Sequence, residues 1–366
     1  MKNIINRDDL LHSVQNVIGA VERRQTLPIL GNILFTAIDG NLSLTATDLE
    51  IEIVSRVTTI EVSDFQTTIP AKKLFDICKA LPDQAQIEFA VEDNKVTLVS
   101  GRSRFTLSAL PAKDYPKLDD INAQQSFSIP HNILKALIDK TSFAMAQQDV
   151  RYYLNGLLIE LSNGLIKLVA TDGHRLAMSE YNTDIQVTFD KQIILPRKGV
   201  MELARLLDNS DALVKLTLSQ NHLRIETEAL TFTSKLIDGK FPDYNRVIPF
   251  DGNNIMTVDR ESLKTTMSRI SILSNEKYRG IKLTLATGNL VIQANNPDQE
   301  EAEEELAVNY NGAEIEIGFN VTYLIDVLNA LHCDNVQLKL KDSNSSCIIT
   351  DANDPSSLYV VMPMRL

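Results

Sequence analysis

The amino-acid sequence predicts an α+β protein made of three similar units, each with two helices packed on antiparallel sheet. Two observations predict this. An amphipathic helix pattern followed by a strand–turn–strand pattern occurs three times, and a second amphipathic helix also occurs three times. The spacing is about 124 residues, as between Asp48 and Asp172. Three such units fill the 366 residues, and each is long enough to bury its own core.

The first helix of each unit carries apolar residues at spacings of three and four, which place them on one face. The three segments are RDDLLHSVQNVIGAV, PHNILKALIDKTSFAMA and DRESLKTTMSRISIL. A hairpin follows each helix, because alternating strands flank Asp39-Gly40, Asn163-Gly164 or Gly288-Asn289. These dipeptides suit a two-residue turn, which needs positive φ.

The second helix recurs as IPAKKLFDICKAL, LPRKGVMELARLL and GFNVTYLIDVLNAL. Alternating strands follow it, as in KVTLVSGRSRFTLSAL and HLRIETEALTFTSKL. Polar or proline-bearing links separate the units, so the predicted domains are residues 1–124, 125–252 and 253–366. Helices on one face of a sheet are the expected α+β arrangement within each domain.

Composition excludes several classes of protein. No stretch approaches the roughly 20 apolar residues that span a bilayer. Cys78, Cys333 and Cys347 are odd in number and form no CxxC pair, which favours reduced thiols in the cytoplasm. No Gly-rich phosphate loop occurs, and the five histidines share no ligand spacing. We therefore expect no cofactor and no metal site.

The charge distribution points in two directions. A net charge of −12 argues by itself against nucleic acid, because phosphate binding depends on Lys and Arg. Basic residues nevertheless recur on corresponding helix faces, as in Lys72 with Lys79 and Lys198 with Arg205. Arg260 shares a face with Lys264 on the third unit's first helix. Solvated helix surface and a nucleic-acid contact both fit this pattern.

Two segments carry opposite charge at opposite ends of the chain. The segment SGRSRFTL near the end of the first unit is basic, and NNPDQEEAEEEL in the third unit is acidic. Exposed sheet edges need cover, and pairing with another subunit supplies it. A basic edge and an acidic edge on one chain favour head-to-tail pairing, which gives a ring if the rotation closes.

The segment VATDGHRLAM resembles an active site, because Asp172 and His174 could form an acid–base pair. The first unit has the same Thr-Asp after the same strand, at Asp48, but no histidine. Asp172 is therefore expected to serve the turn after the strand. A hydrolase that uses Asp172 and His174 is the disfavoured alternative, since no GxSxG elbow or HExxH motif occurs.

Longer motifs resemble one known family over essentially the whole chain. They include TLPILGNILF, QDVRYYLNG, ATDGHRLA, LPRKGVMEL, FTSKLIDGKFPDY, ILSNEKYRG and YVVMPMRL. The sequence resembles the bacterial DNA sliding clamps, the β subunits of DNA polymerase III. The resemblance implies the DNA clamp fold, in which a head-to-tail homodimer forms a ring and its helices line a hole for duplex DNA.

The same resemblance implies a function without catalysis. The ring would tether the polymerase III catalytic subunit and confer processivity, and a separate ATP-dependent loader would place it on DNA. Other polymerases and repair proteins would bind through short peptide motifs. A ring-shaped scaffold that does not bind DNA is the remaining alternative.

The resemblance also assigns residues to three sites. DNA contacts are expected from Arg24, Lys72, Gln148, Tyr152 and Tyr153, although an Arg is usual in the family where Lys72 stands. A partner-peptide groove, in which His174 and Arg175 give a polar rim, is expected from Thr171, Gly173, His174, Arg175, Leu176, Pro242, Val247, Val360, Met362, Pro363 and Met364. The dimer interface is expected from Lys73, Arg102, Arg104, Phe105, Ile272, Leu273, Glu300, Glu301, Glu303 and Glu304.

Overall fold

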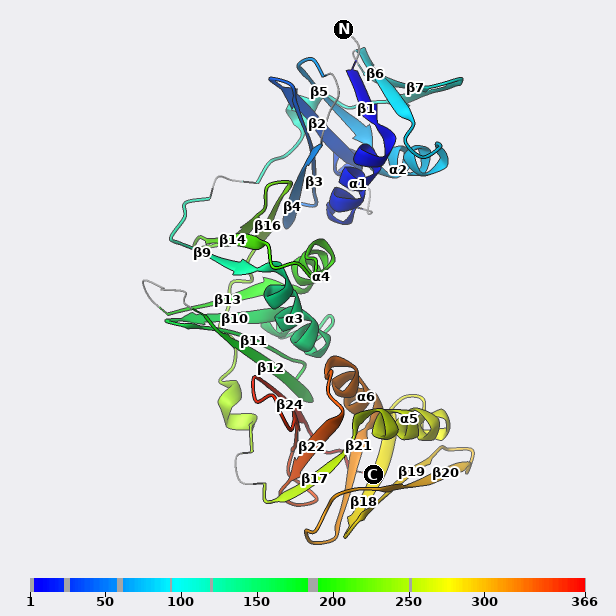
Figure 1. Ribbon diagram of the computed structural model, residues 1–366, viewed down its shortest axis with the longest axis vertical. Helices are drawn as coiled ribbons and strands as arrows, with labels where there is room; N and C mark the ends of the chain where they lie inside the picture. Colours follow the sequence, from blue (N-terminus) through cyan, green and yellow to red (C-terminus); the bar gives the residue numbers. More distant parts are fainter. Residues whose placement is uncertain are drawn as a thin grey trace. The chain divides into compact units, whose positions relative to one another are not determined.

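The computed structural model describes residues 3–22, 27–57, 62–92, 94–118, 121–183, 190–249 and 252–365. These ranges form two compact units, one of Met1–Asn132 with Met201–Leu236 and one of Ile133–Val200 with Ile237–Leu366. Within them lie six α-helices, two for each predicted repeat (Figure 1). They are α1 (Arg7–Val17), α2 (Ala71–Ala80), α3 (His131–Thr141), α4 (Arg197–Leu206), α5 (Arg260–Ile270) and α6 (Val321–Ala330).

The first compact unit holds two antiparallel sheets. The four-stranded sheet has the order β1 (Asn3–Asn6), β6 (Gln86–Glu92), β7 (Lys95–Ser100), β8 (Ser103–Ser108). The eight-stranded sheet has the order β5 (Phe65–Pro70), β2 (Asn32–Ile38), β3 (Asn41–Thr47), β4 (Ile51–Val57), β16 (Leu230–Lys235), β15 (His222–Glu226), β14 (Leu213–Leu218), β9 (Gln125–Pro130).

The second compact unit has the same two kinds of sheet. Its eight-stranded sheet has the order β13 (Lys191–Pro196), β10 (Gly156–Ser162), β11 (Leu165–Thr171), β12 (Arg175–Asn182), β24 (Ser357–Val361), β23 (Cys347–Asp351), β22 (Asn335–Leu340), β17 (Asn254–Asp259). Its four-stranded sheet has the order β20 (Glu301–Ala307), β19 (Asn289–Asn295), β18 (Gly280–Ala286), β21 (Ile315–Asn320).

The expected periodicities account for these elements. In β18 every second residue is buried, from Ile281 to Leu285, as expected for a strand with one face on the core. In α1 the buried residues include Leu10, Val14 and Val17, which share one helical face. The hairpin turns have positive φ at Gly40, Gly164 and Gly288. The expected α+β fold with two helices per repeat is confirmed.

Each eight-stranded sheet joins two predicted repeats edge to edge. In the first unit β4 pairs with β16, and Phe232 lies opposite Ile53. In the second unit β12 pairs with β24 (Figure 1), and Tyr359 lies opposite Ala177. We call these contacts the first and the second junction. The predicted boundaries near residues 124 and 252 stay predictions, and both sheets contain strands from either side of one of them.

In the part of the chain that the structure describes, no helix is long and apolar enough to cross a membrane.

Candidate functional site

The turn between β11 and β12 is built around Asp172. Its Oδ1 accepts hydrogen bonds from the backbone N–H of His174 at 2.9 Å and of Arg175 at 3.0 Å. The Thr171 hydroxyl donates to the Arg175 carbonyl at 2.6 Å and accepts from the N–H of Gly173 at 3.1 Å. This confirms the expectation that Asp172 serves the turn rather than pairing with the His174 side chain.

The first repeat contains the same turn between β3 and β4. Asp48 Oδ1 accepts from the N–H groups of Glu50 at 2.9 Å and Ile51 at 2.8 Å, and the Thr47 hydroxyl donates to the Ile51 carbonyl at 2.7 Å. The position that corresponds to Gly173 is Leu49, and both have positive φ, 76° and 89°. The turn is therefore a property of the repeat, and the Asp is not evidence of catalysis.

The Arg175 side chain, expected at the groove rim, is bound within the chain and is only 11% exposed. Its Nε donates to Asp172 Oδ2 at 3.1 Å, Nη1 to Asp326 Oδ2 at 2.5 Å, and Nη2 to the Phe143 carbonyl at 2.9 Å. The guanidinium also lies over the rings of Tyr323, at 4.6 Å, and Phe143, at 5.3 Å. These bonds use three of the five guanidinium N–H groups, and the expected part of Arg175 in the polar rim stays a prediction.

His174 takes the exposed position of the turn. Its ring stacks on Tyr323 of α6 at a centroid distance of 6.4 Å and an interplanar angle of 17°. Its carbonyl accepts from the N–H of Met362 at 2.9 Å, and the N–H of Met364 donates to Gly318 at 2.9 Å. The C-terminal segment of residues 362–364 therefore lies directly beside the turn, as expected for two walls of one groove.

The apolar floor beside this turn is a single buried cluster. Leu176 and Val360 are register partners between β12 and β24, and both belong to the cluster with Phe241 and Tyr244. Val247 ends the short 3₁₀ helix η6 (Tyr244–Val247) and is 38% exposed. Pro242 is also exposed, and Thr171 is buried. The expected groove residues therefore lie on neighbouring elements of one compact unit.

The loop expected to contact DNA lies against the same turn. Arg151 pairs with Asp149, Nη2 to Oδ2 at 2.9 Å, and this pairing lowers the pKa of Asp149 to about 2. The same guanidinium donates to the Asp172 carbonyl at 3.4 Å. Tyr152 is 57% exposed and meets Tyr153 edge-on, whereas Tyr153 packs on the apolar cluster. Tyr152 is therefore the freer of the two rings.

The remaining expected DNA residues are placed only in part. Gln148 is exposed with φ 55°, and Lys72 is exposed on α2. Arg24 lies outside the described residues. On the helices, two of the basic residues noted above have structural partners: Arg205 donates to the Asn16 carbonyl at 2.7 Å, and Arg260 to the Cys333 carbonyl at 3.0 Å. These two guanidinium groups cap main-chain carbonyls and are not simply solvated.

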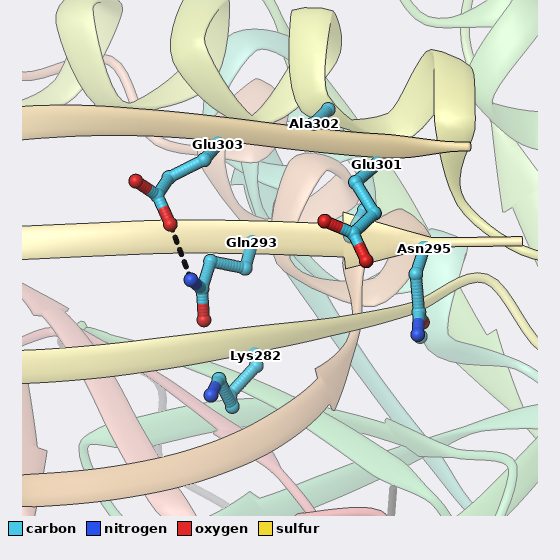
Figure 2. A pocket seen from close by; sticks show the side chains of 8 residues that line it. Lys282, Gln293, Asn295, Glu301, Ala302 and Glu303 are labelled. Atoms are coloured by element: carbon cyan, nitrogen blue, oxygen red, sulfur yellow. Dashed lines mark hydrogen bonds between the residues drawn. The ribbon is translucent and has the colours of Figure 1, made fainter. Parts of the chain in front are cut away.

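Five of the expected interface residues lie on two edge strands, namely Arg104 and Phe105 on β8 and Glu301, Glu303 and Glu304 on β20. β8 ends one four-stranded sheet and β20 ends the other. Glu301 and Glu303 project from the same face of β20 into a shallow pocket beside Gln293 and Lys282, as Figure 2 shows, and the Gln293 amide donates to Glu303. Glu304 projects from the opposite face.

The carboxylate of Glu304 is paired within the chain, and its expected contact with a neighbouring subunit stays a prediction. It accepts from Arg269 Nε at 2.9 Å and from the Thr266 hydroxyl at 3.1 Å. Ile272, in the 3₁₀ helix η7 (Ser271–Leu273), is 75% exposed, which is unusual for a large apolar side chain. Phe105 and Leu273 are half-buried.

One set of residues escaped the sequence comparison. Asp76, Glu202 and Asp326 stand at the same position of the three second helices. At the first junction, Glu202 lies so close to Gly19 that a Cβ there would be 1.8 Å from Oε2. At the second junction, Asp326 holds Arg175. The repeated acid was a signal in the aligned helices, and the structure shows that two of its three members, Glu202 and Asp326, lie at a junction.

Among the described residues, no group of three or more His, Cys, Asp or Glu side chains is placed to hold a metal ion.

Comparisons with known proteins agree across the chain. Models of the N-terminal, central and C-terminal domains of the DNA polymerase III beta subunit match residues 1–119, 128–243 and 245–365. The chain is 54% identical over 364 residues to the beta sliding clamp of Pseudomonas aeruginosa, with 99% of each covered. It is 50% identical over 367 residues to that of Escherichia coli, with 100% of each covered. A crystal structure of the P. aeruginosa clamp bound to griselimycin is similar with a TM-score of 0.97, 53% identity and full coverage of both chains.

Proposed function

This chain belongs to the DNA polymerase III beta subunit family, the bacterial sliding clamps, and we propose that it acts as a closed head-to-tail ring of two chains around duplex DNA. It is a non-catalytic processivity factor that tethers the polymerase and other DNA-processing proteins. A separate ATP-dependent loader places it on DNA, and its place of action is the cytoplasm.

The sheet topology carries the proposal of a ring. Each intrachain junction joins the third strand after the first helix of one repeat to the last strand of the next repeat, β4 to β16 and β12 to β24. Two equivalent strands have no such partner among the described strands. β20 is the equivalent of β4 and β12 in the third repeat, and β8 is the equivalent of β16 and β24 in the first repeat. Pairing β20 of one chain with β8 of another makes a third junction of the same form. Two such contacts close a ring of two chains.

The two intrachain junctions also predict the register of the third. Ile53, Ala177 and Ala302 occupy equivalent positions in the three repeats. Their partners in the preceding strand are three equivalent alanines, Ala46, Ala170 and Ala294. Phe105 occupies the place of Phe232 and Tyr359, its counterparts opposite Ile53 and Ala177. Phe105 is therefore expected opposite Ala302 of the neighbouring subunit.

This register places the charges in complementary positions. Antiparallel pairing with Phe105 opposite Ala302 puts Arg104 opposite Glu303 and Thr106 opposite Glu301. Arg102, in the turn before β8, continues the basic edge. Cross-strand neighbours of opposite charge on one face stabilise a pairing modestly and help to fix its register.

The helix side of the junction can be derived in the same way. At the second junction, the Phe143 ring stacks on Tyr359 at 6.0 Å. Phe143 stands at the position of Ile272 in the third repeat, and Tyr359 at that of Phe105. Ile272 is therefore expected to pack on Phe105 of the neighbour, beside Leu273. Burial of Ile272 and of the exposed parts of Phe105 and Leu273 is expected to supply most of the free energy of association.

Lys73 follows from one more equivalence. It occupies the helix position of Tyr323, which lies against Arg175. Glu300 takes the strand position of Arg175, so Lys73 is expected to meet Glu300 across the subunit interface. The pair adds to the charge complementarity that fixes the partner and orientation.

The DNA contacts are proposed as weak and independent of sequence. Lys72 on its helix and Arg24 meet phosphates, while Tyr152 with Gln148 and Tyr153 meets the template near the groove. Lys72 keeps the charge of the more usual Arg and loses only the planar fork, which matters little for a non-specific contact. Because a ring is held by topology, the contacts can stay weak and permit sliding.

The groove is proposed as the docking site for peptide motifs of polymerases, loader and repair proteins. Its support is the apolar floor of Leu176 and Val360, flanked by Val247 and the C-terminal methionines. Methionine adapts its shape to different ligands, which suits a surface with several partners. His174 offers the exposed polar group at its rim.

The test of the ring is topological. A clamp loaded on a nicked DNA circle is expected to stay bound during gel filtration and to be lost once the circle is cut. Retention on cut DNA to the same extent would show ordinary surface binding. Failure to be retained on either form, with an active loader present, would favour a scaffold that does not bind DNA.

A further inference from the structure

We propose that Asp326 is a positioning residue for the peptide groove. It does not contact the peptide itself, but it binds the Arg175 guanidinium and so fixes the turn of residues 171–175 against α6. The inference rests on the proposed peptide-binding function of the groove. It assigns a role to the acidic residue of α6, which the sequence analysis did not single out.

The contact geometry places Asp326 at the far end of the Arg175 side chain. The hydrogen bond from Nη1 to Asp326 Oδ2 is 2.5 Å long, and both side chains are partly buried, at 11% and 32% exposed. The other guanidinium nitrogens are bound to Asp172 and to the Phe143 carbonyl. Among the described contacts of Arg175, Asp326 is thus the one carboxylate that connects the turn to α6.

Comparison of the two junctions isolates what is special about this contact. At the first junction, Glu202 pairs with Arg205 of its own helix, and Arg205 donates to the carbonyls of Gln15 and Asn16. At the second junction, the acid at the same helix position pairs with an arginine from the turn. Only in the second arrangement does the acid bind a side chain that belongs to a turn, and so only there can it fix the position of that turn.

The position of Arg175 affects the groove through two neighbouring residues, Tyr323 and His174. The His174 ring stacks on Tyr323, which also lies under the Arg175 guanidinium. The His174 carbonyl holds the N–H of Met362. Release of the guanidinium therefore loosens the rim residue His174 and the C-terminal wall together, although neither touches Asp326 in the contacts described.

The test uses the full-length dimer and a fluorescent peptide from a polymerase tail. Asp326→Asn keeps the shape of the side chain and removes its charge, and it is expected to weaken peptide binding about tenfold. The matched control is Asp354→Asn, which removes the charge of another ion pair in the same compact unit, with Lys140 at 3.3 Å. That control is expected to leave peptide affinity unchanged.

A double-mutant cycle separates positioning from general destabilisation. If Asp326 acts through Arg175, then Arg175→Lys and Asp326→Asn together weaken binding no more than the stronger single change. Asp326→Glu, which keeps the charge, is expected to recover part of the affinity. Additive losses in the cycle, with no recovery by Glu, would overturn the proposal.

A variant at the groove rim distinguishes the proposed peptide groove from the proposed role of Asp326. His174→Ala tests the groove itself, because this residue is exposed at the rim. Normal binding by Asp326→Asn together with weak binding by His174→Ala would refute the positioning role and leave the groove intact. Normal binding by both variants, and by a chain that lacks residues 362–366, would place the peptide site elsewhere and remove the basis of both proposals.

Discussion

A charge reversal at the proposed ring closure is the sharpest test of the derived strand register. Arg104→Glu puts a glutamate opposite Glu303 of the neighbouring subunit, and Glu303→Arg puts an arginine opposite Arg104. Either change alone converts an attraction into a repulsion. Both changes together restore opposite charges in exchanged positions. Only a register that pairs these two residues predicts full recovery in the double variant.

The size of the effect follows from the geometry of strand pairing. Residues directly opposite in an antiparallel pair have Cβ atoms about 5 Å apart. At that distance two unit charges in water interact by roughly 0.8 kcal/mol, so reversal changes each interface by about 1.7 kcal/mol. Two interfaces per ring give about 3 kcal/mol, which corresponds to a roughly 200-fold weaker dimer. Salt screens exposed charges, so the effect should shrink toward 1 M ionic strength.

Sedimentation at nanomolar concentration measures the monomer–dimer equilibrium of each variant. The control is Glu316→Arg on β21, which reverses an exposed charge in the same sheet, 63% exposed and away from β20. It is expected to stay dimeric. If the single reversals dimerise normally, or if the double variant is as weak as the singles combined, the register derived from the intrachain junctions is wrong.

Three further outcomes are expected. Ile272→Ala with Leu273→Ala should give folded monomers in sedimentation, because each truncation removes about 1–2 kcal/mol of apolar burial; a stable dimer would place the contact elsewhere. Asp172→Ala should weaken peptide binding in anisotropy, while Asp48→Ala, which loses the same two backbone hydrogen bonds in the first repeat, should not; equal losses would point to general destabilisation. The carboxyl of Asp149 should titrate by NMR near pH 2 rather than near 4, because its pKa is lowered to about 2. The stability that this depressed pKa contributes is present above pH 4 and is lost as the pH falls toward 2; titration at the ordinary value would mean that the pair with its neighbouring arginine does not form in solution.

The repeat architecture could be predicted from the sequence because its signals are local. Gly40 and Gly164 lie in turns with positive φ, as their dipeptides predict. The alternation in each strand then fixes which face is buried. Asp48 identified the role of Asp172, since the same aspartate recurs there without a histidine neighbour and so serves the turn rather than a catalytic pair.

The partners of the long charged side chains could not be predicted, because they depend on groups distant in the chain. Arg175 bonds a carbonyl 32 residues away and a carboxylate 151 residues away. Glu304 meets Arg269 on the helix above its strand. The sequence pattern indicates that such residues lie outside the apolar face of their helix or strand. A charged residue that caps a helix end and one that faces solvent have the same pattern. Only the packing of whole elements decides between them.

The paired turns at Leu49 and Gly173 separate two reasons for which a protein uses glycine. Both residues hold a left-handed backbone, at 76° and 89°, which costs a leucine strain and costs a glycine almost none. At Gly173 an added Cβ would come within 3.0 Å of Arg151 Nη2. Glycine at this place therefore serves two needs at once: it accepts the left-handed backbone without strain, and it leaves room for the end of the Arg151 side chain, through which the loop that carries Tyr152 rests on the turn that carries His174.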